Sequence, residues 1–163
     1  MFYLDLFSAL ARHKVAYALI GGLAVSLHGV ERATMDIDIS VALAPDNLAA
    51  LVEASRELGL VPVLPVPLEN LGDPGLLRRW HEERHMEAFA LRAPGLAGVT
   101  IDVLPFPPVD FAAMNGRAIV FDIGGVPVRV AAIDDLIALK RAVARPIDLA
   151  DIDHLTRIKE QGA

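Results

Sequence analysis

The stretch ERATMDIDISV at residues 31–41 places two aspartates two positions apart in an apolar segment. Because side chains alternate across a β-strand, Asp36 and Asp38 lie on the same face if this segment is a strand. The opposite face then carries the apolar residues that we expect in the core, namely Ile37, Ile39 and Val41. Two carboxylates this close raise the pKa of one of them unless a cation lies between them. The pattern therefore indicates a metal site on this strand.

A third aspartate supports this interpretation. Asp102 interrupts the apolar run GVTIDVL, where an unpartnered carboxylate is costly to bury. If this second strand pairs beside the Asp36 strand, the three carboxylates meet at one edge. Oxygen ligands of this kind suit one or two Mg²⁺ ions. Two such ions can activate an attacking hydroxyl and stabilise a leaving pyrophosphate.

A glycine pair provides a candidate phosphate contact. Gly21 and Gly22 follow the short apolar run at residues 15–20 and precede a short helical segment. Glycines at such a junction allow backbone N–H groups to approach a phosphate closely. The same pair is equally compatible with a tight turn between a strand and a helix.

Composition limits the class of protein. The 163 residues fit one domain, and 54% hydrophobic with 22% charged residues exclude a disordered chain. Without cysteine there is no disulfide, thiolate nucleophile or cysteine-based zinc site. The net charge of −6 argues against broad attraction to nucleic acid. The uncharged run at residues 15–30 is too short to cross a membrane, and the start lacks a basic leader, so we expect a cytoplasmic protein.

Periodicity and turn residues predict alternating helices and strands. We expect helices at residues 2–13, 23–27, from 45 to just before Gly59, around 77–83, at 133–143 and at 147–159. We expect strands at residues 15–20, from Asp36, at 87–91, 99–104, 118–123 and 126–130. The prolines between residues 62 and 74 predict an irregular connection. The order predicts an α/β (α+β) fold: one domain, 1–163, with a mixed-sheet core at 1–131 and a helical segment at 132–163.

Two separated motifs resemble a known family. ALIGGLAVSLHGVERATMDIDISV, followed by TIDVL, is similar to the nucleotidyltransferase superfamily with the DNA polymerase beta-like fold. Its members carry a Gly-Gly or Gly-Ser turn, an Asp-x-Asp strand and a third Asp on a later strand. The R-x-T-x-D-x-D series resembles that of AbiEii-type abortive-infection toxins and their small relatives. LKRAVARPIDLADI at residues 139–152 resembles a helix motif of the same branch.

The resemblance implies a site and a reaction. Its metal ligands and catalytic residues would be Asp36, Asp38 and Asp102, with Asp102 as the base toward the acceptor hydroxyl. Its nucleotide-binding residues would be Gly21, Gly22, Arg32, Thr34 and Lys140, with Lys140 on the phosphates. Two Mg²⁺ ions and an NTP are implied, and the acceptor is an RNA end, a protein or a small molecule. Because Gly22 replaces the serine of many members, backbone donors must bind the phosphate.

Two alternatives to this function remain open. The chain could bind a nucleotide or a partner, such as an antitoxin, without transferring anything. WHEERH at residues 80–85 also matches the zinc-peptidase pattern H-E-x-x-H, with His81 and His85 as ligands and Glu82 as base. The charged Glu83 and Arg84 are unsuited to a buried metalloprotease helix, and a third ligand would have to come from His154 or farther away.

Several other polar residues have ordinary structural interpretations. His28, just before Gly29, is more typical of a structural histidine than of a catalytic one. Arg32 is equally suited to an ion pair with Glu31 or a strand acid and to a phosphate. The last helix carries three residues that can form caps and i,i+3 pairs, Arg145, Asp148 and Asp151.

Overall fold

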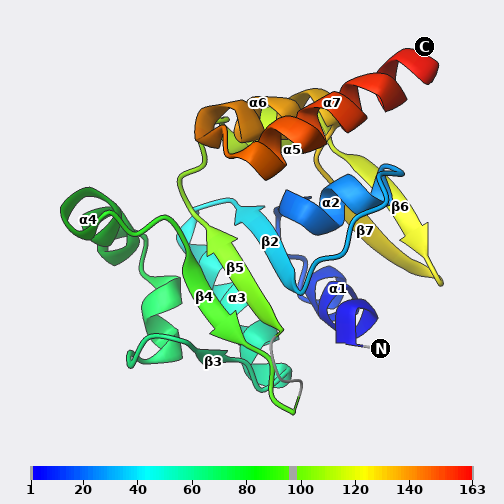
Figure 1. Ribbon diagram of the computed structural model, residues 1–163. Coiled ribbons are helices and arrows are strands. Elements are labelled where there is room, and N and C mark those ends of the chain that lie inside the picture. Colours follow the sequence, from blue (N-terminus) through cyan, green and yellow to red (C-terminus); the bar gives the residue numbers. More distant parts are fainter. Residues whose placement is uncertain (1, 96–98, 163) are drawn as a thin grey trace.

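The computed structural model describes residues 2–95 and 99–162 (Figure 1). The helices of this part of the chain are α1 (Phe2–Arg12), α2 (Gly21–Leu27), α3 (Pro45–Glu57), the 3₁₀ helix η1 (Leu68–Gly72), α4 (Pro74–Arg84), α5 (Phe111–Arg117), α6 (Ile133–Val143) and α7 (Pro146–Gln161). The strands are β1 (Tyr17–Ile20), β2 (Asp36–Val41), β3 (Val61–Pro62), β4 (Phe89–Arg92), β5 (Thr100–Leu104), β6 (Ile119–Ile123) and β7 (Val126–Val130). The expected mixed α/β fold is confirmed.

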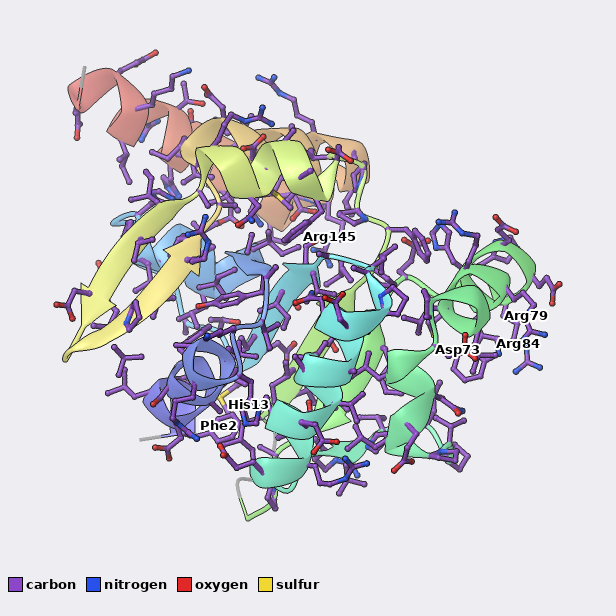
Figure 2. The ribbon with its side chains drawn as sticks, turned by 180° about the vertical axis from the view of Figure 1, so that it is seen from behind. Phe2, His13, Asp73, Arg79, Arg84 and Arg145 are labelled. Atoms are coloured by element: carbon purple, nitrogen blue, oxygen red, sulfur yellow. The ribbon has the colours of Figure 1, made fainter. Side chains whose placement is uncertain are left out.

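All of these strands join one mixed sheet in the order β3-β4-β5-β2-β1-β7-β6. β2 lies at its centre, parallel to β5 and antiparallel to β1. Helices α1 and α3 cover one face, as the view from behind shows (Figure 2). Helices α6 and α7 contact each other and lie across one end of the sheet (Figure 1). The central position of β2 brings its side chains close to neighbouring strands on both sides.

The alternation in β2 produces the predicted two faces. Ile37, Ile39 and Val41 are fully buried in the core. Asp36 is exposed and Asp38 is half-buried on the other face. Burial of each large aliphatic side chain stabilises the fold by about 1.5–3 kcal/mol. This burial fixes the register of β2, because a shift by one residue would exchange the two faces.

Turn and cap residues end most elements where the sequence predicts. Gly59 follows α3 with a φ of +70°, and Gly124-Gly125 turn the β6–β7 hairpin with φ values of +60° and +87°. Such angles cost little in glycine. Between α6 and α7, Ala144 has a φ of +56°, and Pro146 begins α7.

Other parts of the chain differ from the expectation. Helix α2 begins at Gly21 rather than at residue 23, so the glycine pair belongs to the helix. Strand β4 begins at Phe89, two residues late. The region expected to be irregular contains the short β3 and η1. Helix α5 was not predicted, because its seven residues are too few to show helical periodicity, although Asp110 caps it by accepting a hydrogen bond from the Ala113 N–H.

Each helix within residues 2–95 and 99–162 is too short or too polar to span a lipid bilayer.

Candidate active site

The parallel pairing of β2 and β5 brings two of the three aspartates side by side. Asp38 lies opposite Asp102 in the register, and Asp36 lies opposite Thr100. Neighbouring strands are about 4.8 Å apart, so the carboxyl groups of Asp38 and Asp102 are close enough to interact. The pairing that the sequence suggested is therefore present, and it forms an acidic pair on the face of the sheet opposite the buried Ile37 and Ile39.

Asp36 lies near this pair but has its own hydrogen-bond partner. Its Oδ1 accepts a hydrogen bond of 2.8 Å from the Thr100 hydroxyl. Across the described residues, no three acidic or histidine side chains are arranged as a ready metal site. A carboxylate that accepts one hydrogen bond can still bind a cation through its other oxygen, so Asp36 can act as a third ligand without leaving Thr100. The centre of the site is the pair of Asp38 and Asp102, with Asp36 beside it.

Burial and mutual repulsion dominate the electrostatics of the pair. Burial, followed by the charge of Asp102 and a hydrogen bond to it, raises the pKa of Asp38 to about 7. Burial also raises the pKa of Asp102. A hydrogen bond between the two carboxyl groups leaves Asp38 as the protonated donor, while the positive charge of Lys140 favours its ionised form. Burial and repulsion within the pair therefore outweigh the effect of Lys140.

This raised pKa predicts how stability depends on pH without metal. Between about pH 4 and 7 the folded protein keeps a proton on Asp38 that the unfolded chain has lost, so stability falls as pH rises through this window. We expect the loss to be on the order of 2–4 kcal/mol. Urea unfolding in EDTA from pH 4.5 to 8 measures it. The Asp38→Asn variant should show a flatter profile, and an identical slope in both proteins would contradict the assignment.

Gly21 leaves space for the Asp38 carboxylate. Its φ is +74°, and a Cβ added there would lie 2.0 Å from Asp38 Oδ2. The end of β1 thus approaches β2 so closely that a side chain cannot be accommodated. Gly22 lies against Arg32 and Thr34, each with an atom 3.2 Å from the position of an added Cβ. Both glycines therefore have a packing reason to be present, in addition to any contact with a ligand.

Lys140 belongs to a buried network of charges. Its ammonium lies 3.0 Å from Asp151 Oδ2 and 3.5 Å from Asp148 Oδ1. All three residues are less than 8% exposed. Arg145 joins the network through its side-chain Nε, which donates to Asp148 Oδ2 at 2.7 Å. The backbone N–H of Arg145 also donates to that carboxylate. The expected cap of the last helix is therefore present and continues into a larger ion network.

Arg32 completes this network from the other side. Its guanidinium donates to Asp151 Oδ2 at 2.5 Å, so its partner is an acid of α7 rather than Glu31 or a strand acid. The complete ion network has three cations and two anions: Arg32, Lys140, Arg145, Asp148 and Asp151. Its excess positive charge lies beside the acidic pair. Thr34 accepts a hydrogen bond from the Asp36 N–H at 3.3 Å, at the start of β2.

A cleft of about 590 Å³ lies between Asp38 and the helices of the network. Asp38 and Gly21 line it on the sheet side, and Lys140, Arg145 and Asp148 line it on the helix side. Figure 2 shows Arg145 between the C-terminal helices and the sheet. Much of the remaining wall is apolar, with Leu104, Phe106, Pro107, Pro108, Leu136, Leu139 and Val143 among its residues. The cleft therefore presents opposite charges across an apolar space.

The two histidine predictions have clear structural outcomes. The His28 ring contacts the Ala131 carbonyl oxygen through Nε2 at 2.8 Å, which agrees with its structural interpretation. In the H-E-x-x-H segment, Nδ1 of His81 lies 3.1 Å from the Met86 carbonyl oxygen, and His85 ends α4 in a left-handed conformation. No group of potential zinc ligands forms there within the described part of the chain.

The fold of this chain is similar to that of several solved structures. No family model matches the sequence, and no curated protein matches it significantly. The lincosamide antibiotic adenylyltransferase LnuA, bound to lincomycin, matches with a TM-score of 0.60 and 17% identity over 96% of this chain and 94% of LnuA. ANT(2'')-Ia in complex with adenylyl-2''-tobramycin matches with 0.58 and 14%, over 99% of this chain and 97% of that chain. An antigenic nucleotidyltransferase-like protein from Paracoccidioides brasiliensis matches with 0.53 and 17%, over 93% and 74%. This chain therefore has the fold of nucleotidyltransferases.

Proposed function

We propose that this protein is a nucleotidyltransferase that transfers a nucleoside monophosphate from an NTP to an acceptor hydroxyl. The observation that carries the proposal is the cleft, in which Asp38 lies opposite the ammonium of Lys140, while Asp102 lies beside Asp38 on the neighbouring strand. A reaction between a polyphosphate and a hydroxyl needs negative charge to bind cations, positive charge to bind phosphate, and a proton acceptor. The cleft and the acidic pair beside it offer all three.

The residues of the acidic pair suit Mg²⁺. Asp38 and Asp102 supply hard oxygen donors, and a divalent cation would relieve the repulsion between their carboxylates. Asp36 can supply a third carboxylate through the oxygen that does not accept from Thr100. Two bound Mg²⁺ ions would activate the attacking hydroxyl and neutralise charge on the phosphates. The fit rests on the chemistry of these donors.

The residues of the cleft divide into those that contact the substrates and those that support them. Asp102 accepts the proton of the acceptor hydroxyl, whose oxygen forms a bond to the α-phosphorus while the bond from that phosphorus to the pyrophosphate oxygen breaks. The ammonium of Lys140 and the free N–H groups of Arg145 face the cleft and bind the leaving phosphates. Gly21 has no side chain, so the phosphates can approach the backbone where it lies close to Asp38. Gly22, Arg32 and Thr34 support this arrangement through their mutual packing.

The acceptor is the open part of the proposal. Two structural neighbours, LnuA and ANT(2'')-Ia, are seen with lincomycin and with an adenylylated tobramycin. The sequence resemblance to AbiEii-type toxins instead favours an RNA or protein acceptor and a partner antitoxin. The net charge of −6 disfavours a long nucleic-acid track. We therefore test hydroxyl acceptors of all three classes.

A label-transfer assay tests the reaction. Purified protein with Mg²⁺ is given each NTP labelled at the α-phosphate, with a cell extract or hydroxylated antibiotics as acceptors. We expect label on one acceptor class, equimolar pyrophosphate release, and loss of both in EDTA. Label supplied at the γ-phosphate should leave the acceptor unlabelled. Nucleotide binding in Mg²⁺ without pyrophosphate release across all acceptors would instead support a binding module.

A further inference from the structure

One aromatic residue in the cleft wall has no role in the proposed reaction. Phe106 follows β5, which ends at Leu104, and it lines the same cleft as Asp38 and Lys140. Leu104 is already about 7 Å farther along the strand than Asp102. Phe106 therefore lies beyond the acidic pair, in a part of the wall shared with Pro107 and Pro108.

The Phe106 ring is held in place from helix α4. The Arg78 guanidinium carbon lies 4.9 Å from its ring centroid, in a cation–π contact. The His81 ring lies at a centroid distance of 4.8 Å with an interplanar angle of 31°. His81 is itself fixed through Nδ1, 3.1 Å from the Met86 carbonyl oxygen. An aromatic side chain that is supported by its neighbours and also forms a cleft wall loses little entropy when a flat ligand stacks on it.

We propose that Phe106 is the stacking platform for the nucleobase of the NTP. This inference rests on the proposed function and names how that site recognises its nucleotide. An NTP joins a polyanion to a flat ring, and the cleft joins Lys140 and Arg145 to an apolar wall that contains one aromatic side chain, Phe106. Leu139 and Val143 of α6 contribute further apolar surface. Because stacking is tolerant of base identity, we expect less than about tenfold discrimination among the four NTPs.

Binding measurements without acceptor test this platform. The dissociation constants of ATP and inorganic tripolyphosphate, both with Mg²⁺, are measured by calorimetry for the wild-type protein and for Phe106→Ala and Phe106→Trp. Base stacking on an aromatic side chain contributes about 1–3 kcal/mol. We therefore expect Phe106→Ala to weaken ATP binding by about 5- to 150-fold and to leave tripolyphosphate binding unchanged. Phe106→Trp should retain wild-type ATP affinity.

A matched control is Phe121→Ala. Phe121 belongs to β6, and its ring packs against His28 instead of lining the cleft. This control variant should change neither affinity, and thermal unfolding of each variant checks that the fold persists. If Phe106→Ala weakens both ligands equally, or weakens neither, the nucleobase does not stack on this ring and the inference is overturned. If the wild-type protein binds neither ATP nor tripolyphosphate, the proposed function itself fails.

Discussion

Replacing Asp38 by Asn should lower nucleotidyl transfer by about 10³-fold or more while leaving the fold intact. The change removes the charge of the acidic pair's more buried member without altering its size. Asp38 faces the cleft beside Gly21 and opposite Lys140, so its carboxylate is well placed to hold a cation against the phosphates. The measurement is the initial rate of label transfer at saturating NTP and Mg²⁺. In the same variant, the free energy of unfolding at pH 7 without metal should rise, because a carboxyl with a raised pKa destabilises the folded state there.

The matched control is Asp153→Asn, an equal change at an exposed acid of α7 that pairs with Arg157. Its transfer rate should stay within about twofold of the wild type, because exposed ion pairs contribute little. Circular dichroism verifies that both variants are folded. If Asp38→Asn transfers at close to the wild-type rate, the acidic pair does not carry the reaction. If its activity and stability fall together, Asp38 is a structural residue.

The sequence predicts the central part of the fold well, because strong physical signals specify it. The alternation of β2 follows from burying Ile37 and Ile39, and it fixes the face on which Asp36 and Asp38 lie. Burying an aspartate such as Asp102 in an apolar strand costs enough free energy that a partner or a functional role is expected for it. Helix α5 has no such signal, because its seven residues, which follow a proline-rich turn, are too few to show the periodicity of an amphipathic helix.

The network is the part of the site that the sequence alone could not predict. Arg32 and Asp151 are 119 residues apart, and no local pattern links them. On helix α7, Asp148 and Asp151 have the spacing of ordinary caps and surface pairs, yet both are buried. Lys140 stands out only through the family resemblance. Phe106 lies between Pro105 and Pro107, and no sequence pattern there indicates a ligand contact. These residues matter because of what tertiary packing places beside them.

Replacing Lys140 by Met should destabilise the protein by about 2–4 kcal/mol. The variant keeps the length of the side chain but removes the charge between Asp148 and Asp151, which lie 3.5 Å and 3.0 Å from the ammonium. The two buried carboxylates would then repel each other, although Arg145 and Arg32 remain to pair with them. Urea unfolding at pH 7 measures the loss. Tripolyphosphate affinity should fall as well, because the cleft loses a cation.

A second substitution separates charge from packing in this result. In Lys140→Met combined with Asp148→Asn, one carboxylate is removed together with the ammonium, and the Arg145 left behind is largely exposed, with 64% of its side-chain surface accessible. We expect the double variant to regain at least about 1 kcal/mol over the single one, as contacting charges are non-additive. Lys159→Met, which breaks an exposed pair with Asp134, should cost less than about 1 kcal/mol. Additive losses in the double variant would mean that the ammonium of Lys140 and the carboxylate of Asp148 are not energetically coupled, and the ion network would then contribute little to holding α6 and α7 over the cleft.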